Sequence, residues 1–224
     1  MNRVHKIADR GFNEIPLVAI GVKRDRMDNH HLSILYRTPV EFDIMMFHQC
    51  WDLDTRLQSP EPESCDLWVH PNIDPDIGEL LIGYIHSTGT KASQRPFHYG
   101  FDDFRKCLKL DGEYNSTEDS TGMTCSTLVL AVFYTCNCHL VIYESWPQRQ
   151  EDIIWRTNVL RAYISTHRDE MRMIRCLQEQ IDTSIRFRPL EVGGSASSEI
   201  LPVAFGDAVK LAEEIGTLLP VISV

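Results

Sequence analysis

The strongest constraint on the fold is the most apolar run in the chain, Met123 to Tyr134, which begins immediately after a polar loop. The loop, residues 111–122, contains Gly, Asn, Ser and Thr but almost no apolar side chain, as expected of a connection between elements. Residue types that cap helices lie at its end: Ser120, Thr121 and Thr124. The pattern therefore predicts a buried helix that begins close to Cys125.

A cysteine at a helix N-terminus is well placed to act as a nucleophile, because free N–H groups and the helix dipole favour the thiolate. Most cysteines in apolar helices only fill the core, but the polar loop directly before Cys125 favours a side chain exposed at the helix tip. A catalytic thiolate also needs a base, usually a histidine that a third polar group orients. Two upstream segments carry the candidate bases His30, His31 and His48.

Those candidate bases lie on predicted strands. Apolar stretches at residues 15–22 and 31–36, separated by a charged turn, predict two strands, and residues 41–51 predict a third. Because side chains alternate across a strand, His48 shares one face with apolar neighbours. Those neighbours are Phe42, Ile44 and Met46. We expect His48 on the apolar side of the third strand.

Of the two adjacent histidines, His31 is the better candidate for the base. Its face of the strand also carries Ser33, which is small enough to let a helix tip approach. His30 instead shares its face with larger apolar side chains: Leu32, Ile34 and Tyr36. His30 remains the alternative, since a shift of one residue moves the assignment to the other face of the strand.

The remaining segments complete a mixed α and β pattern. Helices are predicted over residues 74–86, 97–110, 150–181 and 205–219, and a further strand over 186–192. The helix over 150–181 is long and highly charged, with apolar side chains along one side. The GGSASS segment at 193–198 indicates a flexible link. We therefore expect an α+β fold in a soluble chain.

Composition narrows the classes of function. The 224 residues are 43% apolar, enough for one domain with a sizeable core. A net charge of −10 argues against nucleic-acid binding, which needs clustered Lys and Arg. The N-terminus resembles no cleaved signal, no stretch reaches the length of a membrane span, and the seven cysteines suggest reduced thiols. We expect a cytoplasmic protein, or one exported without a cleaved signal.

A histidine on one strand, a polar residue on the next and a cysteine heading a helix occur here in that order. The segments are His31–Tyr36, Met45–His48, Phe97–Phe104 and Gly122–Val129, the last containing Cys-Ser-Thr-Leu-Val. In this order they resemble the circularly permuted papain-like thiol hydrolases. That is the branch of the NlpC-type superfamily that includes YiiX-like and lecithin:retinol acyltransferase-like proteins.

The resemblance implies a fold and a site. It implies an antiparallel sheet packed against a helix with an N-terminal cysteine. Residues 1–145 would form the permuted papain-like core, and residues 146–224 a mostly helical C-terminal extension packed on the same domain. It also implies that Cys125 is the nucleophile, His31 the general base and His48 the residue that orients it.

No cofactor or metal is assigned from the sequence. Cys136-Asn-Cys138-His139 lacks the second pair of ligands that a structural zinc site usually has. The histidines show no metal-ligand spacing such as His-Glu-x-x-His, and Gly193-Gly194 lacks the lysine of a phosphate-binding loop. We therefore expect neither metal nor nucleotide.

Two hypotheses of function follow. The first is a cysteine hydrolase, of the amidase or peptidase type, that attacks a peptide-like amide or acyl bond through Cys125 and a histidine. The alternative is a non-catalytic interaction protein on the same scaffold, a component of a larger complex. In that case the charged helix over 150–181 would be the surface that docks a protein partner.

Overall fold

The computed structural model describes residues 3–25, 27, 29–38, 40–41 and 43–221. The strands are β1 (Val4–Lys6), β2 (Val18–Arg24), β3 (His30–Arg37), β4 (Ile44–Trp51), β5 (Asp54–Gln58) and β6 (Leu67–Val69). The helices are α1 (Ile7–Arg10), α2 (Pro75–Gln94), α3 (Cys125–Thr135), α4 (Gln150–Thr166), α5 (Met171–Gln180), α6 (Pro189–Ser197) and α7 (Phe205–Leu218). Short 3-10 turns occur at Phe12–Glu14, Phe104–Lys106 and Tyr143–Ser145.

All six strands form one antiparallel sheet in the order β1-β6-β2-β3-β4-β5. The fold is therefore α+β, as the sequence predicted. The predicted second and third strands correspond to β3 and β4, although the third begins at Ile44, and Phe42 lies outside the described residues. Strands β1, β5 and β6 were not predicted, because three to five residues are too few for a clear alternation.

The sheet is apolar on both faces. One face, which includes Ile34 and Phe47, packs against the apolar sides of α2, α3, α6 and α7. The opposite face carries a smaller cluster that includes Leu35 and Met46 and is closed by the N-terminal segment. Because side chains alternate along a strand, His48 lies on the same face as Met46. This is the face that carries the smaller of the two apolar clusters.

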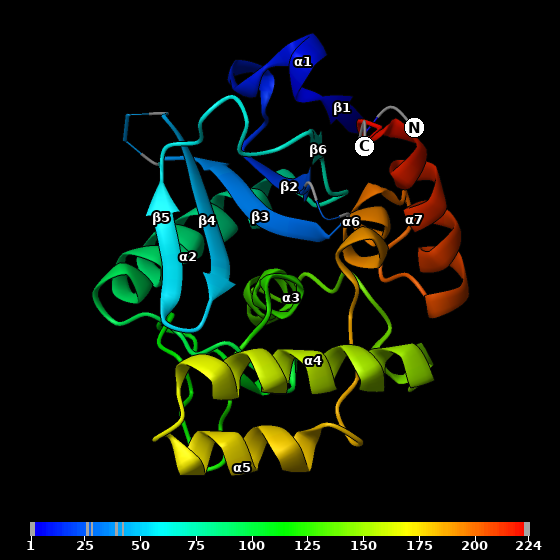
Figure 1. The fold of residues 1–224 in the computed structure, drawn as a ribbon. Helices are drawn as coiled ribbons and strands as arrows, with labels where there is room; N and C mark the ends of the chain where they lie inside the picture. Colours follow the sequence, from blue (N-terminus) through cyan, green and yellow to red (C-terminus); the bar gives the residue numbers. More distant parts are fainter. Residues whose placement is uncertain (1–2, 26, 28, 39, 42, 222–224) are drawn as a thin grey trace.

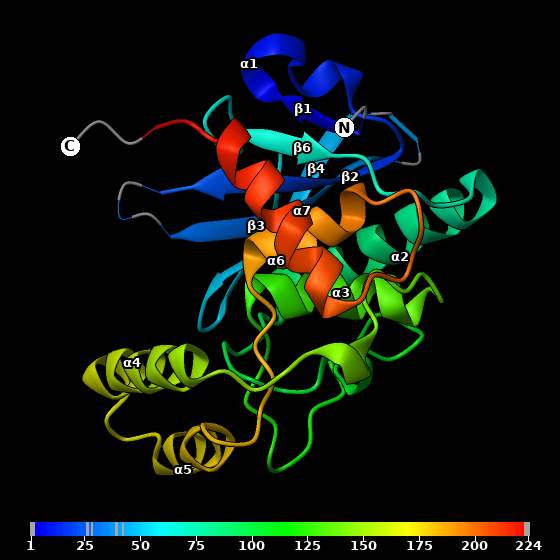
Figure 2. The same cartoon turned by 90° about the vertical axis from the view of Figure 1, so that its right-hand side faces the viewer.

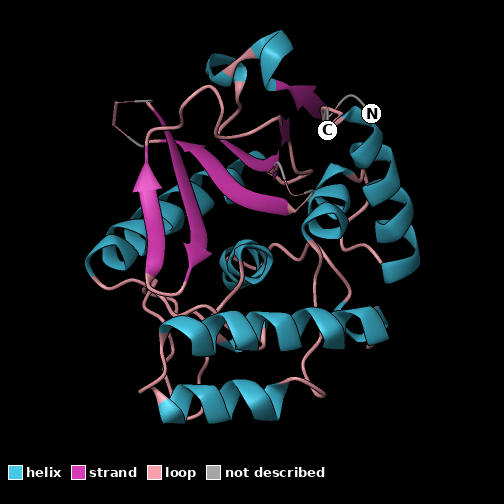
Figure 3. Ribbon diagram, viewed as in Figure 1, coloured by secondary structure: helices cyan, strands magenta, loops and turns pink. Residues whose placement is uncertain are grey.

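The elements stack in tiers, with the sheet above, α3 and α2 beneath it, and α4 and α5 below α3 (Figure 1). In the view turned by 90°, α6 and α7 lie in front of α3, and α6 packs against the inner strands β2 and β3 (Figure 2). Figure 3 shows the strands gathered in one layer, with α1 above it and the other helices on its lower side and flank. Helix α3 is thus enclosed, as its apolar sequence requires: its first nine residues are buried.

Local sequence signals explain where the two central helices begin. Asp74 caps α2 by accepting a hydrogen bond from the Asp76 amide, and Pro75 occupies the first helical position. Thr124 caps α3, with its hydroxyl accepting from the Thr127 amide. The predicted starts of both helices are confirmed, although α2 continues to Gln94, beyond the predicted end at 86.

The prediction of a single helix over residues 150–181 is wrong. The chain forms α4 and α5, which run side by side below α3 and share an apolar cluster (Figures 1 and 2). A continuous helix over this segment would be roughly 48 Å long, too long to bury both ends against one compact body. Folding back at residues 167–170 lets both helices bury their apolar sides.

Three further predictions are wrong. Residues 97–110 do not form a helix; they run as extended chain with one 3-10 turn, because their backbone bonds to the loop before α3. Residues 186–192 are not a strand, since Pro189 starts α6. Residues 193–198 are not a flexible link, because most of them lie buried within α6.

Candidate active site

The site is built around Cys125, the first residue of α3. The start of this helix is fixed by a reciprocal cap, in which the Thr124 amide also donates to the Thr127 hydroxyl at 2.8 Å. Cys125 is 7% exposed, so its thiol is sheltered, and it borders a cavity. Its place in the first turn puts the sulfur beside N–H groups that have no partner within the helix.

The Asp102 carboxylate holds the loop that leads into Cys125. It accepts hydrogen bonds from the Thr121 and Gly122 amides at 2.9 and 3.0 Å. It also accepts from the Gln180 side chain of α5 at 3.0 Å and from the Tyr114 hydroxyl. One partly buried carboxylate therefore joins the loop before Cys125, the 97–110 segment and α5.

Gly122 lets this loop press against the 97–110 segment. Its φ is +109°, a conformation that residues with a side chain rarely adopt. A Cβ here would lie 2.0 Å from the His98 carbonyl oxygen. The Met123 amide donates to that same oxygen at 3.0 Å. The glycine thus sets the direction in which the chain enters α3.

On the sheet side, Cys125 lies where β3 and β4 separate. Their ladder runs from Arg37–Ile44 to Ile34–Phe47, although β3 begins at His30 and β4 continues to Trp51. Beyond the ladder, the Leu32 amide hydrogen-bonds the Cys125 sulfur, and the His31 ring interacts directly with the thiol. The strands therefore open where the helix tip meets the sheet.

The thiol and the His31 imidazole shift one another's pKa toward the ion pair. Burial raises the pKa of Cys125, but the charge and hydrogen bond of His31, together with the Leu32 amide, lower it below its ordinary value. Burial lowers the pKa of His31, but the charge and hydrogen bond of Cys125 raise it above its ordinary value. The arrangement favours a thiolate beside an imidazolium.

His48 contacts the far side of the His31 ring. Its Nδ1 lies 2.9 Å from Nε2 of His31. Burial, followed by the charges of His31 and Arg56, lowers the pKa of His48 to about 4, so the ring is neutral near pH 7. A neutral His48 accepts, through its own Nδ1, the hydrogen bond that Nε2–H of His31 donates. Nδ1 of His31 then remains to interact with the thiol.

His31, His48 and Cys50 also form the one group in the described chain whose ligand atoms are placed to hold a metal ion, all within 4.8 Å of one another. The Cys50 sulfur lies 3.4 Å from Nδ1 of His48. Burial raises the pKa of Cys50 to about 11, so this thiol stays protonated at neutral pH. The 2.9 Å between Nε2 of His31 and Nδ1 of His48 is a hydrogen-bond distance. A metal ion bound by both rings would replace this hydrogen bond.

The sequence did not indicate a role for Tyr99, whose side chain reaches the same site. Burial and the charge of Cys125 raise the pKa of its phenol, which therefore remains a proton donor. The ring packs on Trp51 with centroids 4.7 Å apart, and the Tyr99 amide donates to the buried Asp52 carboxylate at 3.0 Å. No local pattern distinguishes such a tyrosine, because its position depends on the turn between β4 and β5.

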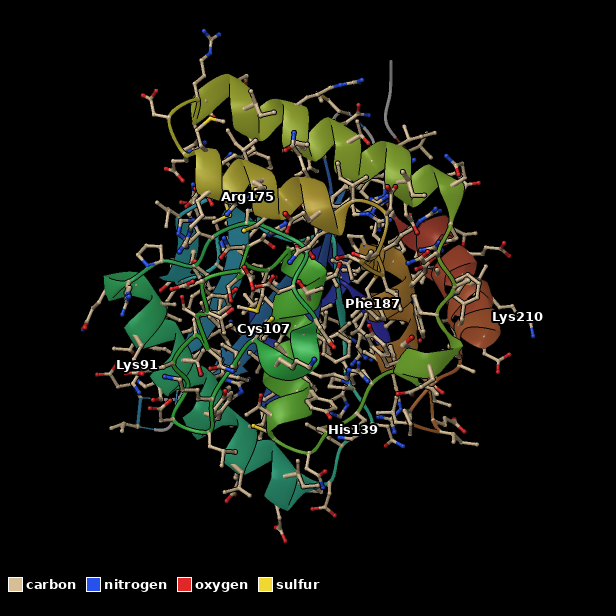
Figure 4. All side chains as sticks on the ribbon, turned by 90° about the horizontal axis from the view of Figure 1, so that it is seen from below. Lys91, Cys107, His139, Arg175, Phe187 and Lys210 are labelled. Atoms are coloured by element: carbon tan, nitrogen blue, oxygen red, sulfur yellow. The ribbon has the colours of Figure 1, made fainter. Side chains whose placement is uncertain are left out.

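A cavity of about 620 Å³ opens beside Cys125. Its walls come from the ends of β3 and β4, the 97–110 segment, the start of α3 and the C-terminal helices. They include Trp51, Tyr99, Phe101, Trp155 and Phe187. Seen from below, Phe187 lies between α3 and α6, in the segment that leads from α5 into α6 (Figure 4). The thiol is therefore reached through a pocket that residues 146–224 help to build.

The structure thus brings together the three residues singled out from the sequence. His31 interacts with the thiol, and His30 borders the cavity. The prediction that the small Ser33 lets the helix tip approach is wrong, because Ser33 contacts the Cys65 sulfur at 3.5 Å on the far side of the sheet. The first turn of α3 meets His31 at the point where β3 and β4 are no longer paired.

No known family matches this chain, and no curated protein or solved structure is detectably similar to it. The site geometry is therefore the basis for assigning a function. Within the part of the chain that the structure describes, no helix combines the length and the apolar character that a bilayer crossing requires.

Proposed function

We propose that this chain is a cysteine hydrolase, of the amidase or peptidase type, on a permuted papain-like scaffold. The observation that carries the proposal is the chain of contacts from Cys125 to His31 to His48 at the tip of α3. A nucleophile, a base and a group that orients the base are the parts that thiol acyl transfer requires. A cysteine that only fills the core has no need of this arrangement.

The reaction begins with the thiolate of Cys125 and the imidazolium of His31. The sulfur attacks the acyl carbon of a peptide-like amide or ester, and the carbonyl electron pair moves to oxygen. Amides at the start of α3, including that of Cys125, together with the Tyr99 phenol, donate to this oxyanion. His31 then gives its proton to the leaving amine or alcohol, and a thioester remains on Cys125.

Hydrolysis of the thioester uses the same residues in reverse. Neutral His31 takes a proton from water, whose oxygen attacks the acyl carbon. The C–S bond breaks, the carboxylic acid leaves, and the thiolate–imidazolium pair re-forms. Throughout, His48 accepts the hydrogen bond from Nε2 of His31 and keeps Nδ1 directed at the reacting atoms.

Alkylation kinetics test the proposal before any substrate is known. Limiting iodoacetamide at neutral pH, followed by mass spectrometry, gives a rate for each of the seven cysteines. We expect Cys125 to react at least about tenfold faster than Cys136, a partly buried thiol at the other end of α3. His31→Ala should remove this advantage and leave the rate of Cys136 unchanged.

A panel of fluorogenic peptide amides and acyl esters then tests turnover. Hydrolysis should require both Cys125 and His31. If Cys125 reacts no faster than Cys136 in the wild-type protein, the thiol is not activated, and the chain is better described as a non-catalytic interaction protein.

A further inference from the structure

Arg156 of α4 is a buried cation whose two terminal nitrogens lack hydrogen-bond partners within the described chain. Its side chain is 1% exposed, and its Nε donates to the Ile181 carbonyl oxygen at 2.6 Å. Within the described chain, neither Nη1 nor Nη2 has a hydrogen-bond partner. These two nitrogens form the end of the guanidinium that matches the two oxygens of a carboxylate.

Leaving such a group unpaired costs the protein stability. A guanidinium stays charged at any physiological pH, so it cannot escape burial by losing its proton. A buried donor without a partner costs about 1–3 kcal/mol, and more when the donor is charged. Arg156 nevertheless lines the cavity that also borders Cys125. An unpaired donor at such a place points to a ligand that completes it.

The neighbouring charges do not satisfy Arg156. The buried Asp152 carboxylate is bound by Arg149, Arg186 and Arg188 at 2.6, 3.3 and 3.0 Å. The other buried acid at this end of the cavity, Glu191, pairs with Arg149. Asp152 and Asp182 act on Arg156 only through space. The nearby acids thus leave Nη1 and Nη2 of Arg156 without a hydrogen-bond partner within the described chain.

Arg186 and Arg188 line the same cavity, but both already pair with Asp152. Arg186 is itself held over the Trp155 ring, 3.9 Å from the ring centroid. Two acids face the cavity, the paired Glu191 and the exposed Glu213. The rest of the wall is largely apolar and aromatic, with Phe101, Trp155 and Phe187. Such a cavity suits a ligand with an apolar body and one anionic end.

We propose that Arg156 anchors a free carboxylate of the ligand in this cavity, with its Nη1 and Nη2 donating to the two oxygens. This inference rests on the proposed function in one respect: it names the substrate of the hydrolase as an acyl compound or peptide that carries a carboxylate away from the bond to be cleaved. Binding energy from that remote group would position the acyl carbon beside Cys125.

Calorimetric titration of the full-length Cys125→Ala variant tests binding separately from chemistry. The probes are benzoylglycine and its neutral amide, benzoylglycinamide, which differ only in the charged end. We expect saturable binding of benzoylglycine that is about 10- to 100-fold tighter than that of the amide. Inorganic phosphate, titrated in parallel, should bind more weakly than benzoylglycine, because it has no apolar body to contact the aromatic walls of the cavity.

Two variants of α4 locate the effect. Adding Arg156→Gln should reduce the affinity for benzoylglycine to that for the amide. Arg161→Gln, an exposed arginine on the same helix, should leave both affinities unchanged. Melting temperatures report whether each variant folds. If Arg156→Gln unfolds, the comparison of acid with amide in the Cys125→Ala protein still decides.

The proposal is wrong if the acid binds no tighter than the amide, if phosphate binds better than the acid, or if a folded Arg156→Gln variant keeps the preference. Each of these results is independent of turnover. A protein whose Cys125 reacts no faster than Cys136, but which prefers benzoylglycine through Arg156, would refute the proposed function and leave the carboxylate site standing.

Discussion

At acid pH, we expect the behaviour of the site to depend on His48. Its pKa is lowered to about 4, so above that pH the ring is neutral and accepts the proton of His31. Below that pH His48 becomes a cation, cannot accept, and repels the His31 imidazolium. Alkylation of Cys125 by iodoacetamide should therefore begin below the pH at which free thiols ionise, and protonation of His48 at about pH 4 should remove any reactivity that persists to that pH.

The variants His48→Ala and His48→Gln test this dependence. Loss of a hydrogen bond to a charged group corresponds to roughly one to two pKa units, so His48→Ala should move the half-maximal alkylation rate upward by that much. Glutamine retains an acceptor that does not titrate and should show a smaller shift. An identical pH profile for all three proteins would exclude His48 as the positioning residue.

We expect Cys125 to be needed for chemistry more than for packing. Cys125→Ala should abolish hydrolysis while the melting temperature stays close to that of the wild type, because the thiol borders a cavity and its removal leaves little new void. Cys136→Ala, at the other end of α3, is the matched control and should keep full activity. A loss of several kcal/mol in stability on Cys125→Ala would instead mean that the thiol is a core residue.

At the scale of elements, the start of α3 depends on the backbone geometry of Gly122. In Gly122→Ala, a Cβ 2.0 Å from a carbonyl oxygen, added to a φ of +109°, should force the loop away from residues 97–110. We expect a loss of stability of about 1–3 kcal/mol and a Cys125 alkylation rate close to that of an ordinary thiol.

Gly83→Ala is the control for that substitution. Gly83 lies in α2, where an added Cβ would meet nothing within 4 Å. Alanine there should raise stability by about 0.5–1 kcal/mol and leave the alkylation of Cys125 unchanged. Chemical denaturation measures both variants. A Gly122→Ala protein as stable and as reactive as the wild type would contradict the assigned role of the loop.

At the scale of the whole molecule, residues 146–224 are part of the fold that holds the site. Gln180 binds the Asp102 carboxylate, and α6 and α7 supply buried members of the main core: Val192, Ala196, Ala208 and Ile215. A fragment of residues 1–145 should therefore lack a cooperative thermal transition in circular dichroism, unlike the full chain. A fragment that melts cooperatively and keeps a fast-reacting Cys125 would show that the N-terminal core folds alone.

The sequence by itself determined the features that local chemistry controls. The polar loop, the capping threonine and the apolar run placed Cys125 at the start of a helix, and alternation placed His31 and His48 on strands. These patterns depend on neighbours within a few residues, so one chain suffices to show them. The final helix, Phe205–Leu218, was readable for the same reason.

Only the tertiary structure decided the features that depend on distant neighbours. Gly193 and Gly194 look like a link in the sequence, but they let α6 pack closely: a Cβ would lie 3.3 Å from Val22 and 2.8 Å from the Ala212 amide. Arg156 looks like any charged position on a helix until α5 and α6 enclose it. Burial, and hence the cost of an unpaired charge, is set by segments far apart in the chain, which no local pattern records.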